Sequence, residues 1–218
     1  IEAYKKSISL KPDYPETYNN LGATLHNQRK LDEAIEAYNK ALSLKPDYAE
    51  AFSNLGLALK DQNRFDEAIE AHEKSILLKP DYAEGYCNLG VVLKDQNRLD
   101  EAIEAHEKSI LLKPDNPDAY NNMGNALRDK GMLDEAIKVY NEAISLSSDY
   151  TKAHKNLTFA LLCKGKLKEG LDKNEWRWKT EKFISTQRHF LQPLWDGKQS
   201  LEGKRILLWC EQGIGDTL

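Results

Sequence analysis

The stretch NQRKLDEAIEAYNKALSLKPDYAEAFSNLG, from Asn27 to Gly56, decides the fold because its parts recur further along the chain. DEAIEA begins at Asp32, Asp66 and Asp100, and the related DEAIKV begins at Asp134. Each copy starts 34 residues after the one before. A fixed period of this size predicts a solenoid, in which one unit cannot bury its own apolar face and stacks on the next.

Apolar residues within one unit recur at helical spacing. Tyr18, Leu21 and Leu25 lie three or four residues apart, and Ile35 and Tyr38 repeat the pattern after a polar break. This spacing predicts two amphipathic helices in each unit.

The residues that interrupt and end the helices support the division of each unit into two helices. Residues 27–30 separate the two helices, and Pro46 closes the unit because proline cannot continue a helix. Asp32 falls near the start of the second helix, where we expect its carboxylate to accept backbone N–H bonds and to favour the helix dipole. The same position is held by Asp66, Asp100 and Asp134.

Small residues mark the places where the helices approach closely. A mid-helix glycine costs about 1 kcal/mol relative to alanine, so a packing reason is expected for each one. These glycines are Gly22, Gly56, Gly90 and Gly124. The residues that we expect opposite them are Ala34, Ala68, Ala102 and Ala136.

The unit resembles the tetratricopeptide repeat. The residues that carry the resemblance are Tyr18, Leu21, Gly22, Leu25, Ala34, Tyr38, Ala41 and Pro46. The resemblance implies an all-α fold, a right-handed superhelix (α-solenoid) of about five helix-turn-helix repeats. It assigns residues 1–182 to the solenoid, with a half repeat (1–14), four complete repeats (15–48, 49–82, 83–116 and 117–150) and a degenerate fifth repeat (151–182).

Two histidines depart from this pattern. His72 and His106 stand where the first and fourth repeats have Tyr38 and Tyr140. Neither histidine has a Cys or His companion at ligand spacing, so we expect core packing and no metal site.

In the family, first helices line the concave wall, so their remaining side chains form the candidate binding surface. One column of this wall is asparagine in every repeat: Asn20, Asn54, Asn88, Asn122 and Asn156. A carboxamide offers both an acceptor and donors, so it can pair with the backbone of an extended peptide. In this asparagine column the repeats resemble those of the O-linked N-acetylglucosamine transferase, which carry a ladder of asparagines along their concave wall. The predicted peptide site also includes Asn19, Asn121, Asn125, Lys60, Lys94 and Arg128.

Two alternatives stay open for this column. The amides can serve only to tie helices together, or they can face water. A different use of the solenoid is self-assembly, because its open ends expose apolar helix faces.

The repeat pattern is lost after Phe183, and residues 183–203 are predicted to be a linker. Residues 204–218 contain an expected strand, Arg205–Cys210, and a glycine loop, Gly213–Asp216. They resemble the start of a two-Rossmann (GT-B type) glycosyltransferase domain, similar to heptosyltransferases, that follows tetratricopeptide repeats in bacterial proteins. The resemblance implies Asp216 as a candidate general base in the parent protein. We expect this chain to be a piece of that protein: a non-enzymatic recognition arm without a cofactor.

Composition excludes several other classes. Residues 151–218 carry 13 basic and 8 acidic side chains, an excess too diffuse for nucleic-acid binding. No run reaches the roughly 18 apolar residues of a membrane helix. The 3 cysteines lack a zinc-binding spacing, which favours a reduced, cytoplasmic setting. The expected partner is therefore a protein or peptide, with no nucleic acid and no membrane.

Overall fold

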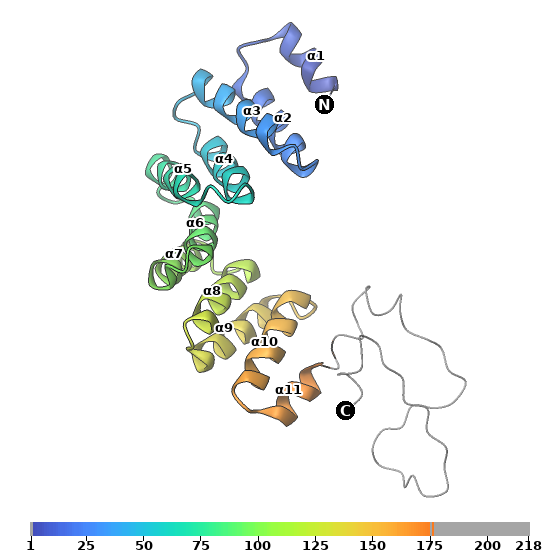
Figure 1. Cartoon of the computed structure of the whole chain (residues 1–218), viewed down its shortest axis with the longest axis vertical. Coiled ribbons are helices and arrows are strands. Elements are labelled where there is room, and N and C mark those ends of the chain that lie inside the picture. The colour runs from blue at the N-terminus through green and yellow to red at the C-terminus, as the bar shows by residue number, and fades with distance from the viewer. Residues whose placement is uncertain (1, 175, 177–218) are drawn as a thin grey trace, which may run out of the picture. The chain divides into compact units, whose positions relative to one another are not determined.

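The computed structural model describes residues 2–174 and Trp176, and this part of the chain is helical without strands. The helices run from α1 to α11 in chain order (Figure 1). Their bounds are α1 (Glu2–Leu10), α2 (Pro15–Asn27), α3 (Leu31–Leu44), α4 (Ala49–Asp61), α5 (Phe65–Leu78), α6 (Ala83–Asp95), α7 (Leu99–Leu112), α8 (Pro117–Asp129), α9 (Leu133–Leu146), α10 (Thr151–Cys163) and α11 (Leu167–Asn174). The all-α solenoid prediction is confirmed. The predicted linker, strand, glycine loop and Asp216 lie outside the described residues.

The helices form a stack of pairs. Each first helix (α2, α4, α6, α8, α10) packs against the second helix that follows it, and each second helix packs against the next first helix. Consecutive first helices also contact one another, whereas consecutive second helices among those described do not. The first helices therefore lie on the inner side of the stack, as Figure 1 shows for the pairs from α2 to α11. None of the described helices is long and apolar enough to span a bilayer.

The turn inside each pair needs one residue with a left-handed backbone. A positive φ, disfavoured for most side chains, is found two residues after the first helix ends. The residues that adopt it are Arg29, Asn63, Asn97, Gly131 and Gly165. Asparagine and glycine tolerate this conformation, which explains the short polar breaks between helices.

The mid-helix glycines pack closely against an aromatic ring on the second helix of their own repeat. A Cβ atom on Gly22 would lie 2.6 Å from Cε1 of Tyr38, and one on Gly56 would lie 2.6 Å from Cε1 and Nε2 of His72. Gly90 meets His106 in the same way. The ring therefore needs the space that each glycine leaves. The predicted alanines are fully buried in the core, and their place opposite the glycines stays a prediction.

The second-helix aspartates lie in the first turn of their helices, as predicted, but the hydrogen bonds of their side chains run to the next repeat. Among the described helices, none that begins with the Leu/Phe-Asp-Glu sequence has a side-chain cap hydrogen bond. Asp32 Oδ1 instead accepts from Gln62 Nε2 at 2.6 Å, and Asp66 Oδ1 accepts from Gln96 Nε2 at 2.7 Å. Lysines replace the glutamines in the later repeats, where Lys130 pairs with Asp100 and Lys164 with Asp134. These aspartates tie each repeat to the next.

Candidate interaction surface

The candidate surface is the inner wall, defined here as the side chains of α2, α4, α6, α8 and α10 at the positions predicted above. The amide row of this wall consists of Asn20, Asn54, Asn88, Asn122 and Asn156. Asn20 is exposed, and the other four are half-buried. All five lie on first helices that contact their neighbours, so the structure brings the row together on one side of the stack.

Each half-buried amide donates one hydrogen bond to the preceding repeat. The four bonds run from Nδ2 of Asn54 to Asn19 Oδ1 (3.0 Å), Asn88 to Ser53 Oγ (3.2 Å), Asn122 to Cys87 Sγ (3.6 Å) and Asn156 to Asn121 Oδ1 (2.9 Å). The tie between helices, left open by the sequence, is therefore present. It uses one of the two N–H groups of each amide.

The amide oxygens are less engaged than the nitrogens. Within the described part of the chain, the Oδ1 atoms of Asn54, Asn88 and Asn156 accept no hydrogen bond. Asn122 differs, because its Oδ1 accepts from Asn121 Nδ2 at 3.4 Å. The row thus presents fixed carboxamides with acceptor capacity to spare.

The predicted cations of the wall are paired with aspartates. Lys60 Nζ lies 3.4 Å from Asp61, and Lys94 Nζ lies 3.0 Å from Asp95. Arg128 Nη2 lies 2.8 Å from Asp129, which is also 3.9 Å from the Lys94 ammonium. We call this group of three cations and three carboxylates the ion-pair row. The sequence analysis predicted the cations but not their pairing with aspartates.

Asp61 is the most engaged carboxylate of the ion-pair row. Its Oδ2 lies 3.1 Å from His26 Nε2 and 3.1 Å from Arg29 Nη1. Burial by itself would raise the pKa of Asp61, but the hydrogen bond with His26 and the nearby Lys60 ammonium outweigh it. The pKa of Asp61 therefore lies below its usual value, and the carboxylate stays charged at neutral pH.

A second charged row lies at the starts of the first helices. Glu50 lies 2.9 Å from Lys79 Nζ, and the hydrogen bond from that lysine is the main cause that lowers the pKa of Glu50. The other ion pairs of this row are Glu16 with Lys45 (4.0 Å) and Asp118 with Lys152 (3.5 Å). Glu84 accepts a hydrogen bond from Tyr82 Oη (3.4 Å). Three of the four carboxylates in this row therefore have a cation within 4.0 Å, whereas Glu84 has a neutral partner within the described residues.

Apolar side chains fill the wall beside the amide row. Leu57 on α4 and Val91 on α6 occupy equivalent positions and are both half-buried. The next equivalent residue, Asn125, accepts from Tyr140 Oη at 2.9 Å, so this predicted site residue is engaged with its own repeat. The large apolar residues at this repeat position are therefore Leu57 and Val91 on the neighbouring helices α4 and α6, and the exposed Phe159 on α10.

Family models match most of the chain. A TPR repeat model matches residues 28–63, 56–96, 92–127 and 124–165, and a tetratricopeptide repeat model matches residues 3–36. The chain belongs to the tetratricopeptide repeat (TPR) family. A comparison with curated protein sequences gives no match.

Solved structures share the TPR fold with this chain. The MamA protein is 27% identical, with a TM-score of 0.66, over 82% of this chain and 98% of that one. TTC0263, a thermophilic TPR protein of Thermus thermophilus, is 21% identical, with a TM-score of 0.67, over 77% and 92%. YrrB, described as a TPR protein with an unusual peptide-binding site, is 22% identical, with a TM-score of 0.62, over 83% and 93%.

The two histidines of the central TPRs are core residues, as predicted. His72 and His106 are fully buried, and neither ring nitrogen of either has a hydrogen-bond partner within the described residues. Burial, with a smaller effect from Lys60 or Lys94, lowers the pKa of each imidazole to about 4. No group of three or more His, Cys, Asp or Glu in the described residues is arranged to hold a metal ion.

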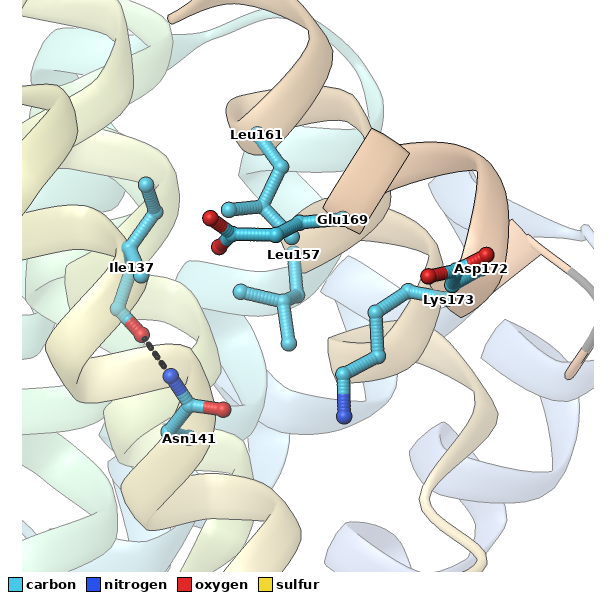
Figure 2. Close-up of a pocket in the computed structure, with 7 residues that line it drawn as sticks. All are labelled: Ile137, Asn141, Leu157, Leu161, Glu169, Asp172 and Lys173. Carbon is cyan, nitrogen blue, oxygen red and sulfur yellow. Dashed lines mark hydrogen bonds between the residues drawn. The ribbon is translucent and has the colours of Figure 1, made fainter. Parts of the chain in front are cut away.

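A cavity of about 230 Å³ lies where the last TPR departs from the repeat pattern (Figure 2). Ile137, Leu157 and Leu161 form its apolar side, and Glu169 and Lys173 reach towards it from α11. Asn141 and Asp172 complete the lining. Lys173 stands where earlier repeats have a buried or half-buried Ala or Val. The cavity is therefore a consequence of the degenerate terminal repeat.

Proposed function

We propose that the chain is a non-enzymatic protein-interaction module that binds an extended polypeptide along its inner wall. The observation that carries the proposal is the amide row, in which Asn54, Asn88 and Asn156 keep an unused Oδ1 acceptor, within the described residues, beside a fixed Nδ2. An extended backbone supplies N–H donors for the Oδ1 atom of a carboxamide and C=O acceptors for its Nδ2 atom. The row can hold such a backbone whatever its side chains are.

The repeat spacing fits an extended ligand. Packed helices lie about 8–10 Å apart, and an extended chain rises about 3.3 Å per residue, so successive amides meet every third residue. The bond from each Nδ2 to the preceding repeat fixes the amide before the ligand arrives. This lowers the ordering cost of binding. The peptide-binding site named for YrrB agrees with such a use, although that likeness is one of fold.

Paired substitutions test the proposal. A peptide selected from a displayed library on the wild-type chain is titrated against Asn54→Ala/Asn88→Ala and against the control Asn39→Ala/Asn141→Ala, which removes two asparagines from second helices. We expect the first pair to weaken binding at least tenfold, or about 1.4 kcal/mol, and the control pair to leave it unchanged. Circular dichroism confirms that both variants are folded. Equal affinities for the wild type and Asn54→Ala/Asn88→Ala would refute the amide row as the binding element.

A second proposal concerns the parent protein. The sequence ILLWCEQGIGDTL, residues 206–218, resembles the first strand and loop of a glycosyltransferase domain. In that case the TPRs would be the substrate-recognition arm of a transferase, and Asp216 a candidate base. The coding sequence beyond Leu218 tests this directly: a second Rossmann-like half supports the proposal, and a stop codon nearby ends it.

Self-assembly is a third proposal, favoured by exposed leucines on the second helices. Leu77 on α5 and Leu111 on α7 are each 80% exposed at equivalent positions of neighbouring repeats. Leu78 and Leu112, the next residues along the chain, are also exposed, and grouped apolar side chains of this kind favour association. Sedimentation velocity at rising concentration would show growth of the sedimentation coefficient, whereas a constant monomer value would exclude it.

A further inference from the structure

We propose that the inner wall selects an uncharged extended segment whose apolar side chains, three residues apart, seat on Leu57 and Val91. This inference rests on the proposed function and specifies its ligand. It is carried by the pairing of every cation in the ion-pair row, by the pairing of three of the four carboxylates in the second charged row, and by the position of the two apolar side chains.

The cations of the ion-pair row are already paired within the described part of the chain. The side chains of Lys60, Lys94 and Arg128 are 24%, 26% and 23% exposed, and each has an aspartate partner. A ligand carboxylate at Lys94 would compete with Asp95 at 3.0 Å and lie close to that charge. Exposed ion pairs contribute only about 0–1 kcal/mol, so the exchange gains little and adds repulsion between carboxylates. An acidic segment is therefore disfavoured.

A basic segment fares no better at the other row. Glu50 has Lys79 as its partner and Asp118 has Lys152, while Glu84 accepts from a tyrosine hydroxyl. An incoming lysine would have to displace a resident lysine from Glu50 or Asp118, and Glu84 offers it one exposed carboxylate, for which an ion pair contributes only about 0–1 kcal/mol. A neutral segment leaves every existing ion pair in place.

The side chains of Leu57 and Val91, called here the apolar seats, lie in register with the amides of the row. Leu57 follows Asn54 by three residues on α4, and Val91 follows Asn88 by three on α6. Residues three apart on a helix share a face, so each repeat presents one amide and one aliphatic side chain side by side. Residues three apart point to opposite faces of a β-strand, whereas a polyproline II segment has three residues per turn and rises about 3.1 Å per residue. The matching extended segment is therefore of the polyproline II type, and it carries an apolar residue at every third position, about 9 Å apart.

Neighbouring repeats both present a branched apolar side chain at this position only on α4 and α6. The equivalent residues are Ala23 on α2, which has no branched side chain, Asn125 on α8, which holds the Tyr140 hydroxyl, and Phe159 on α10, which is 54% exposed. A ligand therefore gains apolar burial at Leu57 and Val91, and a longer segment can also reach Phe159. Because burial of apolar area is favourable and independent of charge, these contacts provide selectivity that a row of amides alone lacks.

Three blocked peptides of one design test the inference. Each has uncharged Ser and Asn spacers, and every third residue is Leu in the first, Glu in the second and Lys in the third. Fluorescence anisotropy at roughly 0.05 M and 0.5 M NaCl measures their affinities. We expect the Leu peptide to bind at least about tenfold more tightly than either charged peptide, with less than about a twofold change between the two salt concentrations.

Variants of the wall sharpen the test. Leu57→Ser/Val91→Ser is expected to lose the preference for the Leu peptide. Asp95→Asn/Asp129→Asn removes both carboxylates near Lys94 and should raise affinity for the Glu peptide in a salt-dependent way. The control Asp47→Asn, at an exposed position of the loop before α4, should change neither the affinity nor its dependence on salt.

The outcomes separate this inference from the proposed function. Tighter, salt-sensitive binding of the Glu or Lys peptide that still requires Asn54 and Asn88 would overturn the inference and leave the proposed function standing. Peptide affinities that are unchanged both in Asn54→Ala/Asn88→Ala and in Leu57→Ser/Val91→Ser would overturn both the inference and the proposed function.

Discussion

Buried His72 and His106 should make the centre of the solenoid sensitive to acid. Burial, aided by Lys60 or Lys94, lowers the pKa of each imidazole from 6.5 to about 4. The unfolded chain therefore binds these protons more tightly than the folded chain does. The stabilisation is fully present above pH 6.5 and is lost as the pH falls from 6.5 towards 4.

The size of the effect follows from the two pKa values. Between about pH 7.5 and pH 5, each histidine lowers the free energy of unfolding by about 2 kcal/mol, and the two together by about 4 kcal/mol if their effects add. This is a large fraction of the roughly 5–15 kcal/mol that stabilises a typical domain.

The assay compares the wild type with His72→Tyr/His106→Tyr. Tyrosine is the residue at the equivalent positions 38 and 140, where it packs against a glycine in the same way. Urea titrations followed by circular dichroism give the free energy of unfolding at both pH values. The carboxylates titrate alike in both proteins, so the difference between their pH responses isolates the histidines. Equal loss of stability in the two proteins would refute the reasoning.

Two further predictions concern packing and reactivity. Gly90→Ala should lower the free energy of unfolding by about 1–2 kcal/mol, because overpacking outweighs the gain in helix propensity; its Cβ would lie 2.6 Å from Cε1 of His106, and an unchanged urea midpoint would contradict this. In a Cys210→Ser background, Cys163 is exposed and should react with Ellman's reagent in the folded protein. Cys87 is buried and burial raises the pKa of its thiol, so it should react only after denaturant is added; two fast-reacting thiols in the native state would be inconsistent with this burial.

The helical hairpins were predictable because their signals are local. Tyr18, Leu21 and Leu25 fix one apolar face by spacing alone, and the break before Leu31 separates the helices. The amide row was also predictable as a row, since equal spacing in a repeat places Asn54 and Asn88 at equivalent positions. Its use in binding stays a prediction.

The partners of these residues were not predictable from spacing. Gln62 bonds to Asp32 across 30 positions, and Asn54 bonds to Asn19 across 35. The sequence predicted a helix cap for the aspartate and left the role of the amide open. Both outcomes depend on how one repeat is rotated and shifted against the next.

The sequence by itself determined the repeat length, the helical hairpins and the residues placed on the first helices, because periodicity and turn chemistry act within a few residues. Only the tertiary structure decided that the predicted cations of the inner wall are paired with aspartates, that an aromatic ring packs closely against each mid-helix glycine of the four complete repeats, and that each half-buried amide of the row donates one N–H to the preceding repeat. These pairings are set by side-chain contact between and within stacked repeats, where distances of a few ångströms choose among partners that a linear pattern treats as equal.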